Sequence, residues 1–429
     1  MAHEEDTRLQ HAVEKVLPPL VIEDLAREVG ALRRDRKLRM ALFVQTLVLG
    51  FGVASGRSLS GFRRLYQRMT HERIARSSFY QRFSGELVQL MKRLLERAIQ
   101  QSRKTSHLAG ALDSFREVLA IDSSIVRVSP KLAEEWPGAW PNHSPATVKI
   151  TAVTNVVGRD FRRLRMVPGS RHDMHLLEPG RWAKNRLLVF DLGFFGARIF
   201  KEVDDAGGFF LSRLKKNAHP TVSRAFEKDD EKLVGFRLHE AQQQASKPVI
   251  DVIASMKYSH RPRDHRKREV DFRVIAIWSD ATQTWHRYVT NAPPEMLPAK
   301  LCSAIYASRW EVELLFKELK SQYRMEEFRS NNGNVNLCFI YAALLSLLVS
   351  RKLHAAVASS FRSRRVPHDR WSRLFAAIST ELLRLCANRD AGGTLTGELL
   401  FFLKSEAPDP NRNRHLLVER SSLGITAFA

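Results

Sequence analysis

The sequence predicts a mixed α/β protein in which a sheet-containing central part is flanked by helical regions. Three observations support this fold class. Residues 1–115 carry helical patterns, apolar β-branched segments then alternate with helical ones from about residue 117, and the chain after about residue 335 is again mainly helical. At 429 residues the chain is too long for one ordinary core, so two or three domains are expected.

The N-terminal region is strongly basic. The whole chain has a formal net charge of +23, which indicates a polyanionic partner, most often nucleic acid. Between Arg57 and Lys104 there are 12 Lys or Arg and three Glu. We expect residues 1–115 to bind DNA through a helical region, although a packing region with basic flanks fits the same pattern. The candidate DNA contacts are Arg63, Arg64, Arg76 and Arg82.

Strand patterns begin after this region. Residues 116–216 are expected to form the first part of a mixed sheet, because apolar β-branched runs are separated there by turns and helical segments. One helical stretch is expected after His172 and Asp173, and a second covers residues 196–207, after a buried strand that ends at Asp191. The other expected strands cover residues 117–128, 147–158, 160–167 and 207–216.

The alternation of strand and helix patterns stops after residue 216. Residues 217–295 carry three strand-like segments and a basic loop, and are interpreted as a β-rich insertion. Residues 296–350 are expected to complete the core and to include the helix that carries Glu313. Residues 351–429 are expected to form a helical C-terminal region that could dimerise. Apolar runs at 41–54 and 337–350 are about 14 residues long, short of the roughly 20 that cross a bilayer, so we expect buried helices and no membrane segment.

The cysteine content argues against two kinds of stabilising site. Cys302, Cys338 and Cys386 are the three cysteines, and none belongs to a C-x-x-C pair. A structural zinc site and a disulfide framework are therefore not expected. The polar, acidic start lacks an apolar signal-peptide core. A cytoplasmic setting fits, with the protein associated with the nucleoid.

Two aspartates stand where acids are costly. Asp122 interrupts the apolar strand in "LAIDSS", and Asp191 closes the apolar run "LLVF". Buried charges are expensive unless they are paired or bind metal. Glu313 follows on a predicted helix, and two strand aspartates with a helical glutamate form a set of oxygen ligands suited to Mg²⁺ or Mn²⁺. This order implies a ribonuclease-H-like fold, while either aspartate alone also fits a turn or cap.

The stretch "YASRWEVELLFKELK", residues 306–320, is expected to be one continuous helix. At roughly 100° per residue, Tyr306, Arg309, Glu313 and Lys320 then share a stripe about 60° wide. A solvated face with ion pairs explains this stripe as well as a functional face does.

These residues resemble a known family. Their Y-(2)-R-(3)-E-(6)-K spacing is similar to that of the DDE transposases of bacterial insertion sequences, in the insertion-sequence-four-like family. Asp122 in "IDSS" and Asp191 in "FDLGFF" match the first two acids, and the resemblance covers roughly residues 115–350. The family also has an insertion between its second and third acids, as expected here for residues 217–295.

The resemblance implies an activity. The chain would cut DNA at the terminal inverted repeats of an element and join the 3′-OH to target DNA, as a homodimer or higher synaptic complex. Asp122, Asp191 and Glu313 would hold two Mg²⁺ ions, with Mn²⁺ as a substitute, while Tyr306, Arg309 and Lys320 would orient the DNA backbone. Trp278 or Trp285 could stack on a flipped base or belong to the core.

Other interpretations stay open. His172 and Asp173 either lie near the site or cap a helix, and Lys149 either serves the site or extends from a strand to solvent. An inactive transposase-derived repressor and an endonuclease that does not join DNA share the same sequence features. A serine or tyrosine recombinase is less consistent, because the further bases and Arg or His partners of that chemistry are not evident.

Overall fold

The computed structural model describes residues 13–33, 38–53, 57–101, 112–140, 142–157, 160–259, 267–359, 366–387 and 397–409. These residues form two compact units. The helical unit comprises the described parts of Met1–Arg103, Ile125–Val148 and Leu315–Arg414. The sheet unit comprises those of Lys104–Ser124 and Lys149–Leu314. Each unit thus combines pieces of several predicted segments, and the roles assigned to those segments stay predictions.

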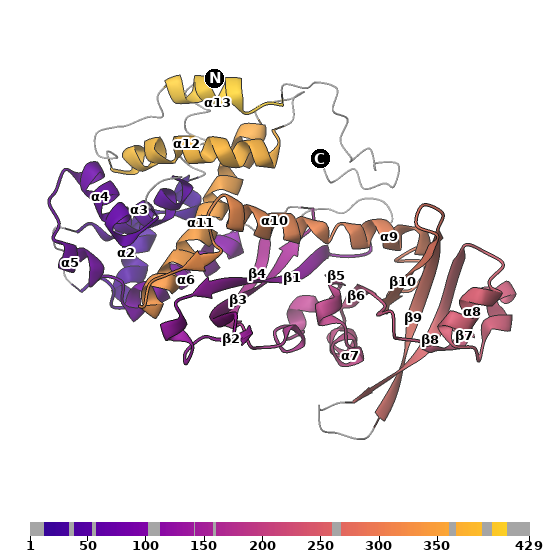
Figure 1. The fold of residues 1–429 in the computed structure, drawn as a ribbon. Helices are drawn as coiled ribbons and strands as arrows, with labels where there is room; N and C mark the ends of the chain where they lie inside the picture. Colours follow the sequence, from indigo (N-terminus) through magenta and orange to yellow (C-terminus); the bar gives the residue numbers. More distant parts are fainter. Residues whose placement is uncertain are drawn as a thin grey trace. The chain divides into compact units, whose positions relative to one another are not determined.

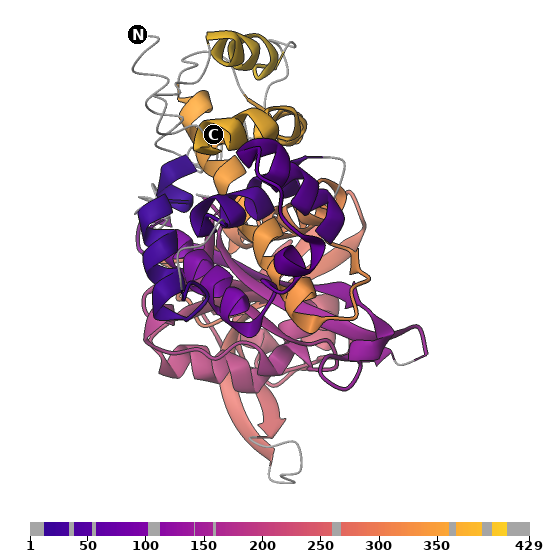
Figure 2. The ribbon, with the colours of Figure 1, turned by 90° about the vertical axis from the view of Figure 1, so that its left-hand side faces the viewer.

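Long apolar helices form the core of the helical unit. Every residue of α3 (Met40–Gly52) is buried, as its apolar composition predicts. Helix α11 (Gly333–Ala358) packs against α3 and α6 (Gly85–Gln101), and α12 (His368–Ala387) packs against α3 (Figure 2). The remaining helices are α2 (Pro19–Glu28), α4 (Leu59–Thr70), α5 (Arg76–Tyr80), the 3₁₀ turn η2 (Pro130–Leu132) and α13 (Gly397–Glu406).

The second apolar run, residues 337–350, lies within a helix that is longer than the run itself. Helix α11 has 26 residues and is long and apolar enough to cross a membrane. The helix continues because the flanking residues are good helix formers, such as Ala355 and Ala356. In its most apolar window 78% of the residues are buried within the protein, which is typical of a core helix.

The strands of the sheet unit are hydrogen-bonded neighbours in one continuous sheet. Strand β4 (Phe161–Pro168) pairs with β3 (Ser144–Asn155), and the order continues through β1 (Glu117–Val128), β5 (Arg186–Phe190) and β6 (Phe209–Arg213). Strands β1, β5 and β6 are parallel neighbours. The order then continues, antiparallel, through β10 (Thr284–Thr290), β9 (Lys267–Ser279), β8 (Val249–Ser259) and β7 (Thr221–Ala225), which Figure 1 displays.

Strands β1 and β3 both continue into the helical unit. There β3 pairs with β2 (Pro137–Trp140), and the last residues of β1 pair with β11 (Glu327–Phe328). Of the predicted basic loop, residues 260–266 lie outside the described residues. Short helices complete the sheet unit: η3 (Asp173–His175), η4 (Arg181–Ala183), η5 (Leu192–Phe194), α7 (Ala197–Asp205), η6 (Lys228–Leu233), α8 (Leu238–Gln244) and α9 (Ala299–Ala307).

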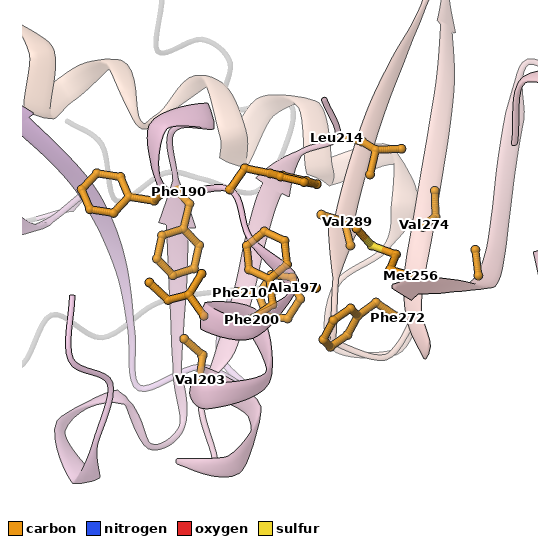
Figure 3. Packing of buried hydrophobic residues seen from close by; sticks show 14 of the residues in the cluster. Phe190, Ala197, Phe200, Val203, Phe210, Leu214, Met256, Phe272, Val274 and Val289 are labelled. Atoms are coloured by element: carbon orange, nitrogen blue, oxygen red, sulfur yellow. The ribbon is translucent and has the colours of Figure 1, made fainter. Parts of the chain in front are cut away.

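Aromatic packing anchors α7 against the sheet. Phe200 of α7 stacks on Phe210 of β6 with ring centroids 4.3 Å apart, and Phe272 of β9 meets Phe210 edge-on at 5.1 Å (Figure 3). All three side chains belong to one buried cluster. Burial of each such ring stabilises the fold by about 1.5–3 kcal/mol. The loop that carries Asp191 enters α7 and is therefore attached to a rigid layer.

The predicted continuous helix over residues 306–320 is wrong. Helix α9 ends at Ala307, and α10 spans Trp310–Ser321. The break has a local cause, because the backbone N–H groups of Arg309, Glu311 and Val312 donate to carbonyls only three residues back. The Ser308 hydroxyl also donates to the Ile305 carbonyl. The four signature residues therefore do not form a stripe on one helix.

Candidate functional site

Two aspartates directly follow the last paired residues of two neighbouring strands. In the parallel pair β1–β5, Ile121 is the partner of Phe190, and the next residues are Asp122 and Asp191. Because parallel strands keep their register, both carboxylates emerge at the same sheet edge. Asp122 accepts from the Ser123 backbone N–H at 2.8 Å, and Asp191 caps η5 by accepting from Gly193 N–H at 3.4 Å. The backbone thus holds both side chains.

Arg309 lies among three carboxylates. One of its terminal nitrogens is 3.9 Å from Asp122 Oδ2, and the other is 3.9 Å from Asp191 Oδ1. The second nitrogen also pairs with Glu313 Oε1. The break between α9 and α10 positions Arg309 at the start of α10, one helical turn before Glu313. The structure therefore brings Asp122, Asp191 and Glu313 around one guanidinium.

Burial makes it costly in free energy to keep all three carboxylates charged. Burial of Asp122 raises its pKa to about 6, because the charged carboxylate loses water there and the negative charges of Asp191 and Glu313 add to the effect. The Ser123 N–H and the Arg309 guanidinium act in the opposite direction. The Arg309 guanidinium is mostly buried, and its Nε has no hydrogen-bond partner. Positive charge at the centre of the three acids offsets their repulsion.

The residue after Asp122 belongs to a further group of interacting polar side chains. The Ser123 hydroxyl donates to Asp173 Oδ1 at 2.8 Å, and Lys149 Nζ lies 3.1 Å from the same oxygen. Lys149 also donates to the Arg171 carbonyl at 2.6 Å, and its side chain is 9% exposed. The structure therefore places Asp173 beside Ser123, the residue after the first acid, and Lys149 points inward rather than to solvent.

Gly193 leaves space for two of these carboxylates. A Cβ at this position would lie 3.2 Å from Asp173 Oδ2 and 3.7 Å from Asp191 Oδ2. Asp173 is thus a fourth acid at the edge of the site. Its role does not follow from the sequence alone, because its partners Ser123 and Lys149 lie far from it along the chain. A lysine within an apolar strand was the available signal.

Tyr306 is buried beside this cluster at the end of α9. Its ring contacts two guanidiniums, with Arg309 Cζ 5.7 Å and Arg213 Cζ 5.6 Å from the ring centroid. Burial raises the pKa of Tyr306, so its hydroxyl keeps its proton and remains a hydrogen-bond donor. Arg213, at the end of β6, was not a candidate in the sequence analysis, because its position depends on the sheet order.

The other candidates lie elsewhere in the chain. Lys320 belongs to the helical unit. Trp278 and Trp285 pair across β9 and β10 with ring centroids 5.6 Å apart, and Trp285 packs against the buried cluster of the sheet unit. The four arginine candidates are all in the helical unit: Arg64 and Arg76 are exposed, Arg82 is half-buried, and Arg63 donates to the Ile74 carbonyl at 3.1 Å.

The donor set fits a divalent cation. Among the residues that the structure describes, no group of three His, Cys, Asp or Glu side chains is close enough to hold a metal ion as arranged. The three carboxylates instead converge on the Arg309 guanidinium. Three hard oxygen donors that already converge on one positive group are the ligand type that Mg²⁺ and Mn²⁺ prefer.

Comparison with known proteins identifies the family. Residues 113–349 match the family model described as "Transposase DDE domain". The chain belongs to this transposase family. The match spans both aspartates and Glu313, so the resemblance drawn from the signature residues is confirmed at the family level. Enzymes of this family cut DNA and transfer strands, and they generally use divalent metal ions.

Curated relatives agree with this assignment. The transposase is 22% identical over 376 residues to that of the insertion sequence IS231F of Bacillus thuringiensis subsp. israelensis, covering 79% of this chain and 78% of the relative. It is 21% identical over 335 residues to that of IS1151 of Clostridium perfringens, covering 68% and 69%. A solved piggyBac transposase synaptic complex with hairpin DNA is 12% identical, with a TM-score of 0.48 and coverage of 94% and 86%.

Proposed function

We propose that Asp122, Asp191 and Glu313 are the catalytic acids of a transposase that cuts at the inverted repeats of its own element. The observation that carries this proposal is their convergence on Arg309. Residues 122, 191 and 313 are far apart in the sequence, and no stabilising role requires three acids around one guanidinium. Their order, an acid within a strand, an acid after a strand and then an acid on a helix, agrees with the family signature.

Each residue would have a definite role in the reaction. The three carboxylates would hold two Mg²⁺ ions, with Mn²⁺ as a substitute. When bound, divalent ions activate water and neutralise charge on the leaving oxygen. Arg309 would then release the carboxylates and turn its guanidinium to the phosphate, to which it can donate two hydrogen bonds. Tyr306 would orient Arg309 through ring contact, and Lys320 would contact the DNA backbone.

The strand chemistry follows from these roles. The oxygen of water attacks the scissile phosphorus, the P–O3′ bond breaks, and the strand end leaves as a 3′-OH. In the second step this 3′-oxygen attacks a phosphorus of target DNA and displaces the 3′-oxygen of the target strand. Asp122, Asp191 and Glu313 serve both steps, because each step is an in-line displacement at phosphorus.

The core is proposed to be ribonuclease-H-like. The strand order β4-β3-β1-β5-β6, with parallel β1, β5 and β6, supports this proposal. Residues 217–295 would be the β-rich insertion between the second and third acids. Residues 1–115 would bind the inverted repeats, with Arg64, Arg76 and Arg82 available at the surface. Residues 351–429 would support dimerisation in a synaptic complex, and the protein would work in the cytoplasm at the nucleoid.

A plasmid that carries the DNA flanking this gene tests the proposal. The purified protein and Glu313→Gln would be incubated with it in Mg²⁺ or EDTA, and the 3′ ends and joined products mapped. We expect cuts at the repeat ends and joining to target DNA in Mg²⁺, and neither in EDTA or with Glu313→Gln. Tight binding of the ends without cutting in Mg²⁺ or Mn²⁺ would indicate a repressor. Cutting without joining would indicate an endonuclease.

A further inference from the structure

The helical unit contains a pocket with an exposed indole at its edge. The pocket has a volume of about 280 Å³, and its wall includes Ile125, Trp140 and Lys320. Trp140, at the end of β2, is 68% exposed. Its exposed ring face is therefore available to a partner, and an indole offers both a flat apolar face and a polar N–H. All the residues that line the pocket belong to the helical unit.

Two cations lie in the same wall. Lys320 and Arg127 both line the pocket, and within the described part of the chain neither forms an ion pair with a carboxylate. Glu326 lines it as well, while the Arg127 backbone N–H donates to the Glu326 carbonyl at 2.9 Å. Two cations and one acid leave a local excess of positive charge, which favours an anionic ligand.

A buried hydroxyl completes the lining. Thr147, on β3, is 2% exposed and lines the pocket, and its Oγ1 has no hydrogen-bond partner. A buried hydroxyl without a partner costs about 1–3 kcal/mol. A ligand with polar edges would offset this cost. The pocket thus combines an aromatic face, two cations and an unsatisfied hydroxyl.

We propose that this pocket binds an unpaired nucleotide of a DNA strand. The base would stack on Trp140 with its polar edge toward Thr147, and its phosphate would lie between Lys320 and Arg127. The base must be unpaired, because the faces of a paired base are covered by its neighbours in the stack. Stacking tolerates any base, since every base has a π-face. The inference rests on the proposed function, because it takes DNA as the ligand.

The pocket and the candidate site share two elements of secondary structure, α10 and β1. Lys320 and Glu313 both belong to α10 and are seven residues apart in the sequence. Ile125 and Arg127 likewise continue β1 beyond Asp122. Two of the elements that carry the acids thus also line the pocket.

Fluorescence anisotropy on the full-length protein tests this binding. The probes are a fluorescein-labelled single strand of about 12 nucleotides, within the usual size range of such sites, and a blunt duplex of the same sequence, both in EDTA. We expect Trp140→Ala to weaken single-strand binding about 5-fold or more, and duplex binding less than twofold. Trp140→Phe keeps an aromatic face and should restore most of the affinity.

Phe401→Ala is the matched control, because Phe401 is 75% exposed in the same unit and lies outside the pocket. It should bind both probes as the native protein does. Arg127→Gln should weaken single-strand binding and reduce its dependence on salt by about one counterion. Unchanged single-strand binding by Trp140→Ala, or equal losses in Trp140→Ala and Phe401→Ala, would overturn the proposal.

Comparing these binding results with the plasmid cleavage experiment separates this inference from the proposed function. If the native protein cuts its element ends while single-strand binding is independent of Trp140, the transposase assignment stands and the pocket proposal falls. If it never cuts them while Trp140→Ala still loses the single strand, the pocket proposal stands without the catalytic one.

Discussion

Arg309 has two opposing effects at the scale of single residues. It neutralises Asp122, Asp191 and Glu313, and it occupies the position toward which all three point. These contacts stabilise the protein, and in the proposed reaction metal binding would displace them. Pattern reasoning could predict the three acids, because a costly charge within or directly after an apolar strand stands out in a sequence. It could not predict the supporting contacts of Asp173 or Arg213, whose partners lie far away in the sequence.

Replacing Arg309 tests this dual effect. Without its charge the three carboxylates repel each other, so we expect Arg309→Ala to lower the free energy of unfolding in EDTA by about 1–3 kcal/mol. Addition of Mg²⁺ should raise the Tm of the variant more than that of the native protein, because ions no longer compete with a guanidinium. Thermal unfolding by circular dichroism measures both effects.

Arg309→Lys is the control for charge, and should keep most of the stability in EDTA. Equal stability of Arg309→Ala and the native protein in EDTA, with equal shifts in Mg²⁺, would show that the guanidinium does not balance the acids.

At the scale of elements, β1 spans residues 117–128 as the sequence predicts, and α7 and β6 lie within their predicted ranges. These elements have clear apolar patterns, and α7 and β6 end at the charged residues Asp205 and Arg213. The break at residues 308–309 could not be predicted, because it depends on a change of hydrogen-bond spacing without Pro or Gly. Strand periodicity is thus a stronger signal than the continuity of a helix.

A buried acid joins three strands of the sheet unit. Glu117 of β1 accepts from Arg162 of β4 at 2.5 Å and from Arg186 of β5 at 2.6 Å. Burial by itself raises the pKa of Glu117, but the hydrogen bonds from both arginines outweigh it and hold this pKa below its ordinary value. The carboxylate therefore stabilises the sheet only while it is ionised.

We expect Glu117→Gln to lower the free energy of unfolding by about 3 kcal/mol at pH 7, because it removes the carboxylate charge that pairs with both Arg162 and Arg186, although Arg162 keeps its ion pair with Asp160. Since the folded pKa is depressed, this contribution is fully present above the unfolded pKa of about 4.3 and is lost as the pH falls through the folded value. Urea unfolding from pH 7 to pH 3 should thus show the two proteins converging in acid.

Glu178→Gln is the matched control, because Glu178 pairs with Arg165 at the surface and should change stability far less. A difference between Glu117→Gln and the native protein that stayed constant down to pH 3 would contradict this account of the ion pairs.

At the scale of the whole molecule, both units are built from separate stretches of the chain. Sequence reasoning divides a chain into consecutive segments, so it could not predict that the described parts of 125–148 and 315–414 would join the N-terminal helices. It could predict the sheet edge, because both aspartates stand out against the apolar strands that precede them. The central claim is that this edge gathers Asp122, Asp191 and Glu313 into one site for divalent metal.

Localised cleavage of the protein by bound iron tests this claim most directly. Fe²⁺ would replace Mg²⁺ in the native protein, peroxide and ascorbate would be added, and the fragments sequenced. We predict backbone cuts near residues 122, 191 and 313 together, suppressed by excess Mg²⁺ and absent in Asp122→Asn. Cuts elsewhere, or the same cuts in Asp122→Asn, would show that the three acids do not hold a common metal.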